Sequence, residues 1–207
     1  MLLANNISFY RQNTIILKDV SLALPPHKII NITGANGVGK TTLLKILTQV
    51  LMPEKGGIFW NGKNIKKNLF DYYKNVTFIM DKQTSNINLS VIENIFFWKK
   101  LFSSKISNKE IDAILDLLSL SGYRNTLINF LSSGEIKKLE LARLVIEQKK
   151  LWILDEPYIG LDIETINLLN ETFINHTKSG GMIIFSSHYV PNISNLENLH
   201  LENYAQH

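Results

Sequence analysis

The chain has 207 residues, 45% of them hydrophobic, with a formal net charge of +4 and no cysteine. This length suits one α/β domain, and the lack of cysteine excludes disulfides and thiolate metal sites, as is usual in a reducing cytoplasm. No apolar run approaches the ~20 residues of a membrane-crossing helix. The N-terminal segment lacks the charged start and long apolar stretch of a signal peptide, so we expect none.

The lysine pairs are spread along the chain rather than gathered in one stripe. They lie at residues 66–67, 99–100, 137–138 and 149–150. Scattered cations are typical of solvated surfaces, whereas nucleic-acid binding needs a continuous basic face. We therefore expect no nucleic-acid partner.

Strands predominate in the first part of the chain. Apolar runs bounded by turn residues predict strands at residues 6–9, 15–24, 29–33, 57–63 and 76–80. The fourth run contains Asn61-Gly62, which favours a tight hairpin turn. A helical pattern at residues 42–51 stands between the third run and the fourth.

A glycine-rich segment joins the third strand to this helix. Gly34 and Gly39 bracket four residues and precede Lys40 and Thr41. Glycines let backbone N–H groups face phosphate oxygens, and the helix presents its positive N-terminus to the same anion. Lys40 is placed to neutralise phosphates and Thr41 to ligate Mg²⁺, so the segment predicts a nucleoside triphosphate site. The expected binding residues are Gly34, Ala35, Asn36, Gly37, Val38, Gly39, Lys40, Thr41 and Thr42.

Helical patterns replace strands from about residue 89 to residue 148. Ser90–Glu93 and Ser107–Glu110 have the form of capping boxes that open helices. Gly122 is placed to end the second of these helices. Because this block interrupts the strands, residues 84–131 are the candidate for an inserted helical subdomain.

Alternation of strand and helix resumes in the last third. Leu151–Asp155 is apolar up to its acidic end, as in a strand buried on both faces. Asp162 is a plausible N-cap for a helix over residues 163–178, and residues 182–186 form another buried strand. The whole predicts one α/β domain over 1–207 with a parallel core sheet, whose nucleotide-binding core covers residues 1–83 and 132–207.

Two acidic residues end the buried strand at 151–155. Asp155 stands where a Mg²⁺–water shell near the phosphate loop needs a counter-charge. Glu156 is placed to polarise a water for attack on a γ-phosphate. Alternatively, both carboxylates are solvated and begin the turn at Pro157.

Two further features have both a structural and a functional interpretation. Ser132-x-x-Glu135 is a capping box for a helix over residues 136–148, and the same helix start can bind a second anion. His188, immediately after the strand at 182–186, is either an ordinary loop residue or part of the phosphate site.

Together these motifs resemble the nucleotide-binding subunits of ATP-binding cassette (ABC) transporters. The family's phosphate loop matches Gly34–Thr42, its signature motif Leu131–Glu135, and its catalytic strand Leu151–Pro157. Its D-loop matches Gly160–Asp162 and its switch histidine His188. This resemblance implies a P-loop ATPase fold with an antiparallel β subdomain, and a head-to-tail pair of such domains that closes around ATP and Mg²⁺.

The resemblance also implies a role for each matching residue. Lys40, Thr41 and Asp155 would handle phosphate and Mg²⁺, Glu156 would activate water, and His188 would sense the γ-phosphate. The signature residues Ser132, Ser133, Gly134 and Glu135 would act on the partner's nucleotide, with Ser132 and Gly134 clamping the γ-phosphate.

Four positions depart from the family pattern or are ambiguous. Ser133 and Glu135 stand where most members have glycine and glutamine, and a carboxylate there weakens phosphate binding unless it caps its own helix. The metal-contacting glutamine of the Q-loop is either Gln83 or, by ungapped spacing, replaced by Lys82. Tyr10 is the expected adenine-stacking aromatic, with Phe9 in the core.

A narrower resemblance is to the ATP-binding subunits of the haem exporter of cytochrome c maturation. It is carried by residues 89–98, 141–144, 151–157 and 179–182. It implies an ATPase on the cytoplasmic side of the inner membrane, working with integral membrane subunits and without binding haem itself. The helical block would dock on those subunits.

Three alternatives stay open from the sequence. One is a soluble ABC ATPase of translation or DNA repair, although such proteins usually carry two cassettes or a long coiled-coil insertion. Another is an ABC subunit that transports a different cargo. The third, suggested by Glu135, is a nucleotide-binding regulator that barely hydrolyses ATP.

Overall fold

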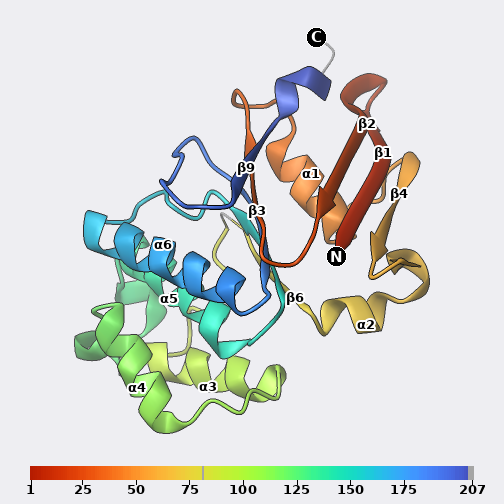
Figure 1. Cartoon of the computed structure of the whole chain (residues 1–207). Helices are drawn as coiled ribbons and strands as arrows, with labels where there is room; N and C mark the ends of the chain where they lie inside the picture. The colour runs from red at the N-terminus through yellow and green to blue at the C-terminus, as the bar shows by residue number, and fades with distance from the viewer. Residues whose placement is uncertain (81, 205–207) are drawn as a thin grey trace.

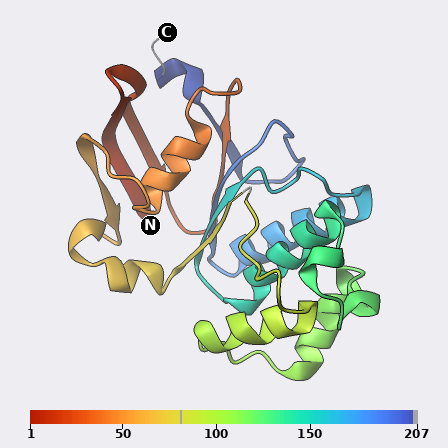
Figure 2. The same ribbon diagram turned by 180° about the vertical axis from the view of Figure 1, so that it is seen from behind.

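A computed structural model describes residues 1–80 and 82–204. Figures 1 and 2 show two sheets with α1 between them and a group of helices at one end. The strands are β1 (Leu2–Arg11), β2 (Thr14–Leu24), β3 (Ile29–Thr33), β4 (Lys55–Trp60), β5 (Lys63–Asn64), β6 (Val76–Ile79), β7 (Leu151–Asp155), β8 (Met182–Ser186) and β9 (Leu196–His200). The helices are α1 (Lys40–Leu47), α2 (Leu69–Tyr73), α3 (Val91–Leu101), α4 (Asn108–Leu117), α5 (Ser133–Ile146) and α6 (Ile163–Lys178).

The larger sheet is parallel throughout, in the order β6-β7-β8-β3-β9. Strands β7 and β8 are buried at every position, as their unbroken apolar sequences predict for a sheet covered on both faces. Their register pairs Asp155 with Ser186, while β3 pairs Thr33 with His200 of β9. The carboxyl ends of these strands therefore meet at one edge, where the site is built.

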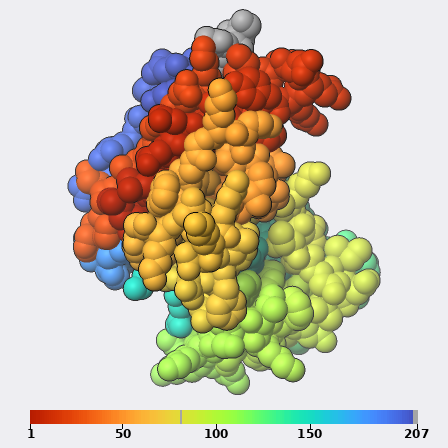
Figure 3. All heavy atoms as spheres, turned by 90° about the vertical axis from the view of Figure 1, so that its right-hand side faces the viewer, coloured from red at the N-terminus to blue at the C-terminus, as the bar shows by residue number. Residues whose placement is uncertain are grey.

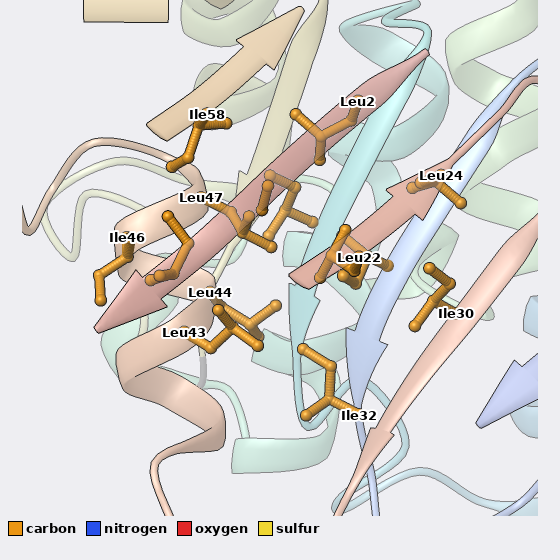
Figure 4. Packing of buried hydrophobic residues seen from close by; sticks show 14 of the residues in the cluster. Leu2, Leu22, Leu24, Ile30, Ile32, Leu43, Leu44, Ile46, Leu47 and Ile58 are labelled. Atoms are coloured by element: carbon orange, nitrogen blue, oxygen red, sulfur yellow. The ribbon is translucent and has the colours of Figure 1, made fainter. Parts of the chain in front are cut away.

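The smaller sheet is antiparallel, in the order β2-β1-β4-β5. Its apolar face packs on α1, which in turn packs on the parallel sheet. Figure 4 shows this core, with Leu43 and Leu44 of α1 between the two sheets. Asn61 and Gly62 both take positive φ, 49° and 78°, and join β4 to β5 as the Asn-Gly pair predicted.

Helices α3 and α4 form a separate hydrophobic cluster with part of α5. Its members include Ile95 and Trp98 of α3, Ile111 and Leu115 of α4, and Leu139 of α5. Figure 3 shows the yellow-green and green helical segment at the lower end of the molecule, below the red and orange strands. Helix α6 covers the other face of the parallel sheet through a third cluster, which has Phe173 at its centre.

Both predicted capping boxes of this helical segment form. The side chains of Ser90 and Ser107 accept from the backbone N–H groups of Glu93 and Glu110, and each glutamate accepts in return from the backbone N–H of its serine. Reciprocal capping satisfies N–H groups that have no partner within the helix. The sequence pattern therefore located both helix starts correctly.

Replacing Ser107 with alanine is expected to lower the free energy of unfolding by about 1 kcal/mol, the usual cost of losing a serine N-cap. The Ser107 hydroxyl lies 3.2 Å from the backbone nitrogen of Glu110. Urea denaturation measures the change. Glu110→Gln is the matched control, because glutamine also completes a capping box; an equal loss in both variants would contradict the assignment to the serine cap.

Some predicted boundaries are wrong. Gly122 does not end the second helix of the block: α4 ends at Leu117, and Ser119 takes the positive φ (56°) expected of a glycine. Helix α5 begins at Ser133 rather than at residue 136, because Ser132 is its N-cap. Strand β9 has no counterpart among the predicted strands.

Candidate active site

The phosphate-loop segment runs from the end of β3 to the start of α1, as predicted. Gly39 is the N-cap of α1 with φ 111°, and no side chain caps the helix. A Cβ at Gly39 would lie 3.0 Å from Leu17, so the loop packs directly on β2. Among the described residues, no side chain accepts from the first-turn N–H groups of α1, as a helix start that receives an anion requires.

Lys40 reaches back over the loop that precedes it. Its ammonium nitrogen donates to the carbonyl oxygens of Gly34 (2.8 Å) and Ala35 (3.3 Å). The side chain is largely buried, so its charge lies within the loop rather than in bulk water. The positive charge of Lys40 is therefore held beside the loop backbone that is expected to receive a phosphate group.

Thr41 and Asp155 meet at the carboxyl edge of the parallel sheet. The Thr41 hydroxyl donates to Asp155 Oδ2 over 2.8 Å, and Asp155 is 3% exposed. The hydroxyl of Ser186, at the end of β8, donates to Asp155 Oδ1 over 2.6 Å. The sequence does not single out Ser186, although it ends the strand next to β7. Its hydrogen bond fixes the rotamer of Asp155 and leaves Oδ2 directed at Thr41.

Glu156 follows Asp155 in an unusual backbone conformation. Its φ is +47°, which is uncommon for a residue with a side chain, and its backbone N–H donates to the Ser186 hydroxyl over 3.1 Å. Burial raises the pKa of the Glu156 carboxyl, while His188 and Lys40 act in the opposite direction. A carboxylate with a raised pKa is a stronger base, as activation of a water molecule requires.

His188 follows β8 and lies beside the phosphate loop. Its Nε2 atom is 2.9 Å from Asn36 Oδ1 and 3.2 Å from Lys40 Nζ. Protonated at Nε2, it donates to Asn36; deprotonated there, it accepts from Lys40. The same atom is 3.9 Å from Glu156 Oε1. His188 therefore joins the residue after Asp155 to the loop that precedes α1.

The four signature residues lie at the N-terminus of α5. Ser132 and Glu135 form a capping box in which Ser132 Oγ donates to Glu135 Oε2 over 2.8 Å. The backbone N–H and hydroxyl of Ser132 and the hydroxyl of Tyr123 lower the pKa of Glu135, which thus remains ionised. Gly134 packs closely on the segment before α6, since a Cβ there would lie 3.1 Å from the Gly160 carbonyl oxygen.

This signature segment does not meet the phosphate loop within the chain. Among the described residues, no hydrogen bond or ion pair joins Ser132, Ser133, Gly134 or Glu135 to Gly34–Thr42. Its neighbour is the segment before α6 instead, where Lys138 Nζ pairs with Asp162 Oδ2 over 2.6 Å. The N-termini of α1 and α5 are thus two separate places in the described part of the chain.

The predicted Q-loop and adenine-stacking residues lie outside the group formed by Lys40, Thr41, Asp155 and His188. The Gln83 amide donates to the Ser85 carbonyl oxygen (3.3 Å), and within the described residues it makes no hydrogen bond to Thr41 or Asp155. Lys82 is exposed. Tyr10 lies opposite Ile15 in the β1–β2 hairpin, and the next residues, Ile16 and Leu17, contact the phosphate loop at Gly39.

The sequence also does not single out Glu140, which binds the segment that carries Gln83. This α5 carboxylate accepts from the backbone N–H groups of Thr84 (2.8 Å) and Ser85 (2.6 Å). It is 3% exposed, and Arg143 lies one turn further along the helix at 3.4 Å. Two charge-assisted bonds to backbone make this a strong attachment.

The family profile described as "ABC transporter" matches residues 17–159, about two-thirds of the chain. The chain belongs to the ABC transporter family. As an ABC-type ATPase domain, it binds nucleotide and hydrolyses ATP. Its parallel sheet, antiparallel sheet and helices confirm the fold that the sequence motifs predicted.

Relatives of this ABC ATPase match along nearly their whole length. The cytochrome c biogenesis ATP-binding export protein CcmA of Idiomarina loihiensis is 35% identical over 98% of this chain and 93% of its own. The solved structure of an ATP-binding subunit of an ABC transporter shares the fold with a TM-score of 0.85, at 22% identity over 97% of this chain and 86% of the other. A dimeric ATP-binding cassette, in a post-hydrolysis state bound to ADP and Pi, matches with a TM-score of 0.77, at 19% identity over 97% and 95%.

No helix among the described residues is long and apolar enough to cross a membrane. Likewise, the described part of the chain has no cluster of three or more histidine and acidic side chains arranged to hold a metal by themselves.

Proposed function

We propose that this chain is the ATP-hydrolysing subunit of a membrane-associated ABC complex that serves haem handling in cytochrome c biogenesis. The observation that carries the proposal is the 35% identity, over 98% of the chain, to a protein named as a cytochrome c biogenesis ATP-binding export protein. The phosphate-loop geometry supports the ATPase part independently, through Lys40 and the uncapped start of α1.

The loop Gly34–Thr42 is the proposed triphosphate site. Lys40, now bonded to two loop carbonyl groups, is the cation that pairs with phosphate oxygens. Glu156 is the proposed general base that removes a proton from the attacking water, and its raised pKa suits that role. His188, between Asn36 and Glu156, is the proposed γ-phosphate sensor, and Tyr10 the proposed adenine-stacking residue.

The residues around Thr41 fit a magnesium ion. A hydroxyl and a carboxylate 2.8 Å apart supply the hard oxygen ligands that Mg²⁺ prefers. A single aspartate suffices, because Mg²⁺ in nucleotide sites keeps water and phosphate oxygens as its other ligands. When bound, the ion would neutralise phosphate charge during hydrolysis. Gln83 is a proposed further ligand.

The separation of the two helix N-termini supports a composite site. Within the described residues, no hydrogen bond or ion pair joins Ser132–Glu135 to the phosphate loop, so we assign them to the nucleotide of a second subunit. The capping box restrains Glu135, which lessens the conflict between its charge and a γ-phosphate. A homodimer or a paired ABC subunit would provide this arrangement.

The helical block at about 84–131 is the proposed inserted subdomain and docking face for integral membrane subunits. On α3, Phe96, Phe97 and Leu101 are 40–59% exposed. Apolar side chains gathered on one exposed helix are typical of a protein contact. The chain would accordingly lie on the cytoplasmic face of the inner membrane, without contacting haem or nucleic acid.

Deletion of the gene in its own host is expected to abolish covalent haem attachment to c-type cytochromes, which haem staining of membrane proteins measures. Wild-type protein should restore the signal, and Glu156→Gln should not. If cytochromes c mature normally in the deletion strain while another transport activity is lost, the haem assignment is wrong but the ATPase assignment stands.

A further inference from the structure

The last described residues end beside the phosphate loop. Strands β3 and β9 are parallel neighbours, so they finish together, with Thr33 opposite His200 (Figure 1). The loop follows β3, and a 3₁₀ turn, Leu201–Tyr204, follows β9. Leu201 is fully buried in the hydrophobic cluster that contains residues of both sheets and of α1, which anchors this turn.

Glu202 in this turn contacts the start of the loop. Its Oε1 atom accepts a hydrogen bond from the backbone N–H of Ala35 over 2.7 Å. Its Oε2 atom lies 3.0 Å from the point where Gly34 would carry a Cβ, so the absence of a side chain at Gly34 makes room for the carboxylate. A second contact ties the strand ends together, since His200 Nδ1 and Thr33 Oγ1 are 2.8 Å apart.

The Ala35 residue is consequently held from two sides. Glu202 binds its N–H group, while Lys40 donates to its carbonyl oxygen over 3.3 Å. The backbone N–H of Val38 also donates to that carbonyl oxygen over 3.3 Å, whereas Glu202 is the side chain that binds the Ala35 N–H group. The N–H groups of Glu202 and Ala35 lower the pKa of the Glu202 carboxyl, which keeps its hydrogen bond charge-assisted at neutral pH.

We propose that Glu202 is a positioning residue for nucleotide binding: it holds the Ala35 end of the phosphate loop in the conformation that receives the triphosphate. The proposal rests on the assignment of Gly34–Thr42 as that site. It predicts that the acceptor oxygen matters more than the negative charge. If the Glu202 carboxylate instead repelled the phosphate groups, both Glu202 variants would bind ATP more tightly than wild type.

Two substitutions of Glu202 distinguish loss of the hydrogen-bond acceptor from loss of the negative charge. Glu202→Gln keeps an oxygen acceptor for Ala35 without the charge, whereas Glu202→Ala removes both. Binding of a fluorescent ATP analogue to the full chain should weaken about three- to tenfold in the alanine variant, the scale of the net contribution of one hydrogen bond. The glutamine variant should stay within about twofold of wild type. In ATPase assays the alanine variant should raise KM and leave kcat at saturating ATP nearly unchanged.

Glu197→Gln is the matched control. Glu197 lies on β9 and pairs with Lys28 at the surface over 2.7 Å, away from the loop. Affinity equal to wild type in Glu202→Ala, or tighter binding in both Glu202 variants, would overturn the positioning role. A fall in kcat alone would overturn it as well.

A Lys40→Ala variant measured alongside separates this inference from the proposed site. If Lys40→Ala weakens ATP binding and Glu202→Ala does not, only the role of Glu202 fails. If Lys40→Ala binds as wild type does, the assignment of the site itself fails. Thermal melting of each variant reports whether a loss of affinity follows from a loss of folding.

Discussion

Glu156→Gln is expected to reduce steady-state ATP hydrolysis by about 10²- to 10⁴-fold, the usual contribution of a general base. Glutamine has nearly the same shape but cannot accept the proton of the attacking water. Among the described residues, no hydrogen bond or ion pair joins Glu156 to Gly34–Thr42, so ATP binding should persist. The variant should then hold ATP in a closed dimer.

Phosphate release and size-exclusion chromatography with ATP measure these two results. Glu171→Gln is the control, since Glu171 is an exposed residue of α6 and the same charge is removed there. Normal hydrolysis by Glu156→Gln would show that another group activates the water. Loss of ATP binding would instead place Glu156 among the nucleotide-holding residues.

Lys40→Ala is expected to weaken ATP binding by about 10- to 100-fold, and hydrolysis at sub-saturating ATP should fall with it. Lys40 supplies the buried cation of the loop, and hydrogen bonds from charged groups are worth ~1.5–3 kcal/mol each. Alanine also leaves the Gly34 and Ala35 carbonyl groups without the Lys40 donor.

Equilibrium binding of a fluorescent ATP analogue measures the change in affinity. Lys45→Ala is the matched control on the same helix, because Lys45 lies in the last turn of α1, at the end opposite the loop. Unchanged affinity in Lys40→Ala would mean that the loop is not the nucleotide site.

Local sequence patterns predicted the parts of this structure whose causes are local. A capping box depends on two side chains three residues apart, so Ser90, Ser107 and Ser132 could each be located from spacing alone. The bounds of α6 follow in the same way from Asp162, whose carboxylate accepts from the Thr165 N–H. The glycines of the phosphate loop likewise determine only the backbone conformation of the turn in which they lie.

Features that depend on distant segments could not be found in this way. Strand β9 has the mixed sequence Leu-Glu-Asn-Leu-His and is exposed at most positions, so it lacks the apolar run of a core strand. It forms because the edge of β3 offers hydrogen bonds, which is a consequence of tertiary structure. The contacts of Glu202 with Ala35 and of Ser186 with Asp155 depend on the same strand order.

The helix stop at Gly122 shows a different limit. Glycine is the common C-terminal residue of helices, yet here Ser119 takes the positive φ and Gly122 lies in a later 3₁₀ turn. Leu118 and Leu120 are both buried in the helical cluster, so packing determines where α4 ends. Burial of these two leucines therefore outweighs the preference for glycine at the end of a helix.

The attachment of Glu140 to Thr84 and Ser85 has a mechanical consequence. The backbone N–H groups of Thr84 and Ser85 both donate to one buried carboxylate, so the motion of this segment is coupled to that of α5. The segment that carries Gln83 follows β6 in sequence, but it is fastened to the helix that begins at Ser132. If α5 rotates when a second subunit engages Ser132, Thr84 and Ser85 should move with it, because both are bonded to Glu140 of that helix.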